Sequence, residues 1–121
     1  MHASPALILV ITTSDNLSTL EAISRELLEQ HLVACVQISS PVTSHYRWEG
    51  VLTQSAEFLL TAKSRAELFP AIQTAIRSRH NYELPEILVL RAEASEDYHR
   101  WVLRETKSLG DLRDEHPPTA L

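Results

Sequence analysis

The 121-residue sequence is poor in glycine, cysteine and positive charge. Its two glycines are too few to build the glycine-rich loops that cradle phosphate groups. A single cysteine, Cys35, excludes an internal disulfide and the zinc modules built from several cysteines. Lysine and arginine number 11 against 16 aspartates and glutamates, a net charge of −5, which argues against a nucleic-acid binder.

Long hydrophobic runs are also absent. The longest aliphatic run, residues 6–11, is far shorter than the ~20 residues that a membrane span requires. The first four residues carry no lysine or arginine, so we expect no secretory signal peptide, no membrane partner and a cytoplasmic location. The length and the apolar fraction of 44% fit one globular domain with one core.

Short apolar runs alternate with amphipathic stretches along the chain. The predicted strands are residues 6–13, 33–39, 43–48, 51–63 and 86–92. Three helices are predicted. The first begins at a cap residue that is Asp15, Asn16 or Ser18, the second begins after Ser64, and the third begins at Ser95. Glu49-Gly50 predicts the turn of a long hairpin. Pro70 predicts an irregular first turn or a late start for the second helix, and Gly110 predicts the end of the last one.

The order of these elements is βαββαβ with an extra C-terminal helix, and it predicts an α+β, ferredoxin-like sandwich. We expect an antiparallel sheet in the strand order 4-1-3-2, counting the longer hairpin arm as the third strand, with both crossover helices on one face. Residues 1–112 should form this domain, and the polar, proline-broken residues 113–121 should form a disordered tail. The fold by itself does not define a function.

No motif in the sequence predicts an enzyme. The patterns G-x-S-x-G, H-E-x-x-H, G-x-x-x-x-G-K-[ST] and G-x-G-x-x-G are missing. Lys63, His80 and Tyr82 are the only obvious candidates for acid–base chemistry. Cys35 lies in an apolar strand and is predicted to act as a small core hydrophobe rather than as a nucleophile.

His80 is the histidine with the best surroundings for a metal ion. Glu83 and Glu86 follow it in a loop that Pro85 restrains. Imidazole and carboxylate ligands suit a first-row divalent cation and favour Cu(II). Without a second histidine or a cysteine nearby the set is incomplete, and capping and solvated charge are the alternative interpretation of these residues.

The hairpin carries aromatic side chains on a half-apolar ribbon. Tyr46, Trp48 and Phe58 can form a ligand-stacking platform or a subunit interface. We favour the interface, because a ribbon with apolar side chains and open strand edges requires a partner.

Several segments together resemble the CutA divalent-cation tolerance proteins. They are Ile11-Thr12-Thr13-Ser14-Asp15, Leu32-Val33-Ala34-Cys35-Val36, Tyr46-Arg47-Trp48-Glu49-Gly50, residues 57–63 and His80-Asn81-Tyr82-Glu83-Leu84-Pro85-Glu86-Ile87. The resemblance covers nearly the whole chain, from Ala6 to Leu109. It implies a ferredoxin-like fold in a tight homotrimer with hairpins pairing across subunits. It also implies a cytoplasmic protein of copper and divalent-metal tolerance with no established enzymatic activity.

The same resemblance implies a metal site. In bacterial members the proposed copper ligands are a histidine and a glutamate that match His80 and Glu86, together with a cysteine. Ile11 stands at the position of that cysteine, so the site should be weaker or differently shaped, with little affinity for Cu(I). Cu(II) or another divalent cation is the expected ligand, and no cofactor is obligatory.

Two other functions remain open. A small-molecule sensor like the trimeric PII signalling proteins would bind nucleotides between subunits, although glycines and clustered basic residues are lacking. The second alternative function is that of a structural trimer that anchors another protein. The sequence does not identify that protein.

Overall fold

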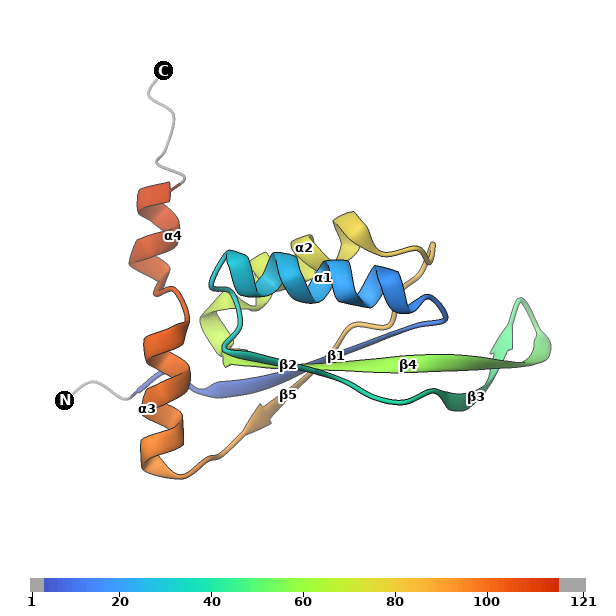
Figure 1. The fold of residues 1–121 in the computed structure, drawn as a ribbon, viewed down its shortest axis with the longest axis horizontal. Helices are drawn as coiled ribbons and strands as arrows, with labels where there is room; N and C mark the ends of the chain where they lie inside the picture. The colour runs from blue at the N-terminus through green and yellow to red at the C-terminus, as the bar shows by residue number, and fades with distance from the viewer. Residues whose placement is uncertain (1–3, 116–121) are drawn as a thin grey trace, which may run out of the picture.

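The computed structural model describes residues 4–115, which form one antiparallel sheet with helices on both of its faces (Figure 1). The strands are β1 (Leu7–Ser14), β2 (Cys35–Ile38), β3 (Val42–Trp48), β4 (Val51–Arg65) and β5 (Leu88–Ala92). The helices are α1 (Leu17–Glu29), α2 (Phe69–Arg79), α3 (Glu96–Glu105) and α4 (Leu109–Glu115).

The strand order is β2-β4-β1-β5, and β3 pairs with the part of β4 that extends beyond the other strands. This is the predicted 4-1-3-2 order, so the α+β, ferredoxin-like sandwich is confirmed. Helices α1 and α2 lie side by side over one face of the sheet, and the β3–β4 hairpin projects away from it (Figure 1).

Alternation along β1 divides the sheet into two unlike faces. Ile8 and Val10 point towards α1 and α2 and belong to the buried core. Leu9 and Ile11 point to the opposite face, where they pair with Leu90 and Leu88 of β5. Helix α3 covers only one end of that face, and Leu88 and Leu90 remain 52% and 48% exposed.

The residues at the helix starts and at the hairpin turn determine the bounds of these elements much as predicted. The Asn16 side chain caps α1 by accepting a hydrogen bond of 3.2 Å from the backbone N–H of Thr19. Glu49 and Gly50 have φ values of 50° and 80°, the left-handed pair that a two-residue hairpin turn requires. A short 3₁₀ turn, Ala66–Leu68, precedes α2 and leaves Pro70 in the first turn of that helix.

The prediction of one helix from Ser95 to Leu109 with Gly110 as its end is wrong. Helix α3 ends at Glu105, and α4 begins at Leu109 and contains Gly110. The second start has its own cap, because the Ser108 hydroxyl accepts from the Asp111 N–H at 3.2 Å. Helix α4 continues through Glu115, beyond the predicted domain end at residue 112. Residues 116–121 of the predicted tail lie outside the described residues.

Cys35 does not occupy the core position predicted for it. On the edge strand β2, Val36 and Ile38 pack against the core cluster, and the alternation of the strand turns Cys35 to the other face. There it is half-buried and pairs in register with Lys63.

Candidate functional site

The end of β1 meets the loop between α2 and β5. Ser14 donates a hydrogen bond of 2.6 Å from its hydroxyl to Oδ1 of Asn81. Asn81 in turn donates from Nδ2 to Oδ1 of Asp15 at 2.9 Å. These bonds join residues more than 60 positions apart and hold the loop against the strand end.

His80 is bound through both of its ring nitrogens. Nδ1 accepts from the backbone N–H of Tyr82 at 3.0 Å, so Nε2 carries the proton and donates to the Thr13 carbonyl at 2.8 Å. Burial lowers the pKa of His80 below 6.5, and the Thr13 carbonyl and the nearby Asp15 and Glu57 oppose that shift. The ring is therefore neutral at physiological pH, and neither nitrogen offers a free lone pair.

Tyr82 connects the loop to the middle of β4. Its hydroxyl donates to Oε2 of Glu57 at 2.6 Å and accepts from the backbone N–H of Asp15 at 2.9 Å. Glu57 is only 7% exposed. Burial, followed by the hydrogen bond to Glu57 and its charge, raises the pKa of Tyr82 well above 10. The phenol stays protonated at neutral pH and holds the two segments together.

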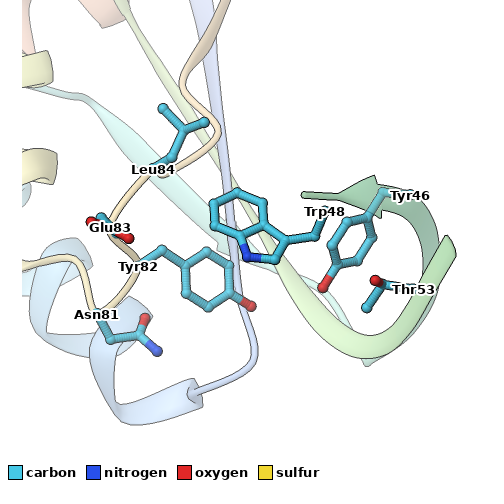
Figure 2. A pocket seen from close by; sticks show the side chains of 7 residues that line it. All are labelled: Tyr46, Trp48, Thr53, Asn81, Tyr82, Glu83 and Leu84. Atoms are coloured by element: carbon cyan, nitrogen blue, oxygen red, sulfur yellow. The ribbon is translucent and has the colours of Figure 1, made fainter. Parts of the chain in front are cut away.

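A cavity of about 290 Å³ lies between the hairpin and this loop (Figure 2). Its lining residues are Tyr46, Trp48 and Thr53 from the hairpin and Asn81, Tyr82, Glu83 and Leu84 from the loop. In the view of Figure 2 the Trp48 indole stands between the side chains of Tyr82 and Tyr46. An adjoining cavity of about 370 Å³ is also lined by His45, Glu57 and Glu86. Burial and the neighbouring Glu57 raise the pKa of Glu86.

The three predicted metal ligands point to different places. Glu83 lines the first cavity and Glu86 the second, whereas the His80 nitrogens face Thr13 and Tyr82. Within the part of the chain that the structure describes, no group of three or more His, Cys, Asp or Glu side chains is placed to hold a metal ion. As folded, a single chain does not offer the fit that a metal ion needs, and metal binding by His80, Glu83 and Glu86 stays a prediction.

The predicted aromatic cluster separates in the same way. Tyr46 and Trp48 are 39% and 43% exposed on the hairpin. Phe58 instead packs against the core of its own chain, because it lies opposite Ser14 on the face that α1 and α2 cover. Sequence reasoning did not find Glu57. Its signal was a carboxylate directly before the apolar residues Phe58-Leu59-Leu60, because a carboxylate in a sheet interior is seldom buried without a partner.

The fold and this site define a small ferredoxin-like protein with a ligand-sized cavity at the base of a projecting hairpin. The chain belongs to the CutA1 divalent ion tolerance protein family, whose profile matches residues 8–105.

Two CutA proteins are similar to this chain over most of its length. Protein CutA of Homo sapiens is 34% identical over 100 residues, which are 82% of this chain and 56% of that protein, so this chain spans about half the length of the human relative. The divalent-cation tolerance protein CutA of Thermus thermophilus is 34% identical over 98 residues, 80% of this chain and 95% of that protein.

Among solved structures, the periplasmic divalent cation tolerance protein CutA of Archaeoglobus fulgidus superimposes with a TM-score of 0.79. It is 28% identical, and the match covers 84% of this chain and 99% of that one. None of these three names describes a catalytic activity. No helix within residues 4–115 has the length and hydrophobicity to cross a bilayer.

Proposed function

We propose that this protein takes part in the tolerance of divalent metal ions, and that it does so in the cytoplasm by binding rather than by catalysis. The observation that carries the proposal is the family match over residues 8–105, with the Thermus thermophilus relative aligned over nearly its whole length. Removing the gene from its source cell should lower the Cu(II) concentration that permits growth, and the wild-type gene should restore it. Unchanged growth across a series of divalent cations would contradict the proposal. Cell fractionation tests the location.

Cu(II) is the ion that we propose to bind at the loop, through His80, Glu83 and Glu86. Imidazole and carboxylate ligands favour Cu(II) among the divalent ions. Binding has to free Nδ1 of His80 from the Tyr82 N–H, and this requirement should make the affinity modest. Below about pH 6 protons compete for the imidazole, and binding should weaken further.

Calorimetric titration of the intact protein with Cu(II) tests these ligands. His80→Ala should lower the affinity at least tenfold, roughly 1.4 kcal/mol. His99→Ala is the matched control, because His99 lies on α3 and its Nε2 is hydrogen-bonded to the Pro5 carbonyl. If the His80→Ala protein binds copper as tightly as the wild type does, the loop is not the site.

We also propose that the chain assembles as a homotrimer through the open face of the sheet and the hairpin. Leu88 and Leu90 supply apolar area that no element within the described residues covers. The β3 edge, with the exposed Tyr46 and Trp48, supplies strand pairing and further apolar area.

A further inference from the structure

The two cavities beside the hairpin share a set of aromatic and apolar walls. Tyr46 and Trp48 come from the hairpin, and Tyr82 and Leu84 come from the loop; all four line both cavities. Together the two cavities extend from Tyr46 and Trp48 on β3 to Glu57 in the middle of β4. Each cavity, about 290 Å³ and about 370 Å³, lies at the lower end of the size range of small-molecule pockets, roughly 300–1,000 Å³.

The charge along these walls has one sign. Glu83 lines the first cavity, and Glu57 and Glu86 line the second. His45 is the one side chain in the two linings that can carry positive charge, and no lysine or arginine of the described residues takes part. Arg47, the neighbour of these aromatics in the hairpin, lines only a third cavity, which shares His45, Tyr46 and Thr53 with the first two. A phosphate-bearing ligand would find no countercharge here, whereas a cation would.

The aromatic walls select among cations. A metal ion needs several oxygen or nitrogen ligands around one point, and the described side chains provide no such group. An alkylated ammonium is weakly hydrated, carries its charge over methyl groups, and is attracted to the negative face of indole and phenol rings. Tyr82 is already fixed by its bonds to Glu57 and to the Asp15 N–H, so this wall needs no ordering on binding.

We propose that the cavity between the hairpin and the loop binds a small organic cation of the alkylated ammonium class. The rings of Tyr46, Trp48 and Tyr82 contact its methyl groups, and the carboxylate of Glu83 lies beside its charge. This site needs no metal ion, and it shares Glu83 with the copper ligands proposed above.

A matched pair of probes tests the charge requirement on the full chain in the presence of a metal chelator. One probe is choline, a trimethylammonium alcohol, and the other is 3,3-dimethylbutan-1-ol, in which carbon replaces the charged nitrogen. In calorimetric titration choline should bind about tenfold more tightly than the uncharged alcohol, a difference between those of exposed and of fully desolvated cation–π contacts. Equal binding of the two probes, or no binding of choline, would overturn the proposal.

Variants then test the walls. Trp48→Leu should weaken choline binding about tenfold, whereas Trp48→Phe, which keeps an aromatic face, should retain most of it. Glu83→Gln should weaken choline binding a few-fold and leave the uncharged alcohol unaffected. Trp101→Leu on α3, where Trp101 packs at a tilt against Tyr98 outside the cavity, is the control and should leave choline binding unchanged. The proposal is wrong if Trp48→Phe loses as much as Trp48→Leu, or if Trp101→Leu weakens binding equally. Circular dichroism and elution volume show whether each variant keeps its fold and assembly.

Discussion

At neutral pH the surroundings of His80 keep its ring uncharged. Because burial lowers the pKa of His80 in the folded state, the unfolded chain takes up this proton first as the pH falls. Stability contributed by the neutral ring is fully present above about pH 6.5 and is lost as the pH falls below that value.

Urea unfolding at about pH 7.5 and about pH 5.5 measures this loss. The free energy of unfolding should fall more steeply in the wild type than in His80→Gln, which does not titrate. A His80→Gln slope equal to that of the wild type would show that His80 does not contribute.

Thr12, in the middle of β1, lowers the stability of the folded protein because it buries a polar atom without a partner. Its side chain is fully buried, and its Oγ1 has no hydrogen-bond partner. Valine has the same shape without the polar atom, so Thr12→Val should raise the free energy of unfolding by about 1 kcal/mol. Thr106 is the contrasting residue, since its buried hydroxyl accepts from Arg65 and donates to the Val102 carbonyl. Thr106→Val should therefore destabilise the protein, and denaturant unfolding of both variants checks the opposite signs.

Among the elements, the C-terminal end of α3 is fixed by hydrogen bonds from Arg65, a residue at the end of β4. Arg65 donates from Nε to Thr106 Oγ1 at 3.0 Å and from Nη2 to the Thr106 carbonyl at 3.1 Å. Nη2 also reaches the Leu103 carbonyl, and Nη1 pairs with Glu67 at 2.9 Å. These bonds satisfy the last carbonyls of α3 where the helix gives way to an extended residue.

Arg65→Met keeps the aliphatic stem and removes the donors. We expect a loss of about 2–3 kcal/mol, because buried helix-end carbonyls lose their partners. Arg100→Met is the matched control: its pair with Glu96 is mostly exposed, at 57% and 89%, and should contribute little. Thermal and urea unfolding compare the two variants. Similar small losses would mean that Arg65 does not anchor α3.

Arg65 also explains what the sequence could and could not predict. The turn at Glu49-Gly50 and the late start of α2 depend on neighbouring residues, so local patterns predicted them correctly, and such patterns narrowed the α1 cap to three candidates that include Asn16. The end of α3 depends on a side chain about 40 positions away, which no local pattern contains. The candidate site also depends on residues that are far apart in the sequence. Tyr82 meets Glu57 and Asp15 only after β1 and β4 have paired, and His80 turns to Thr13 for the same reason.

For the whole molecule, the open face of the sheet allows a direct test of assembly. Light scattering of the wild type should give about three times the 13.7 kDa of one chain. Leu90→Lys places a charge on that face and should shift the mass towards a single chain. Leu28→Lys is the matched control, since Leu28 is 42% exposed on α1, on the other side of the molecule. A wild-type mass near 13.7 kDa would refute the trimer.

Strand β4 changes its neighbours along its 15 residues. Residues 60–63 lie between β1 and β2, whereas residues 51–57 pair with β3 alone. Alternate amides of that outer half therefore point to an edge that no described strand covers. In an isolated chain they exchange with solvent deuterium quickly, while the amides of the inner half exchange slowly. If hairpins pair between subunits in the proposed trimer, the outer amides will be protected, and their exchange rates will report the fraction of assembled molecules. One strand thus contains both a marker of folding and a marker of association.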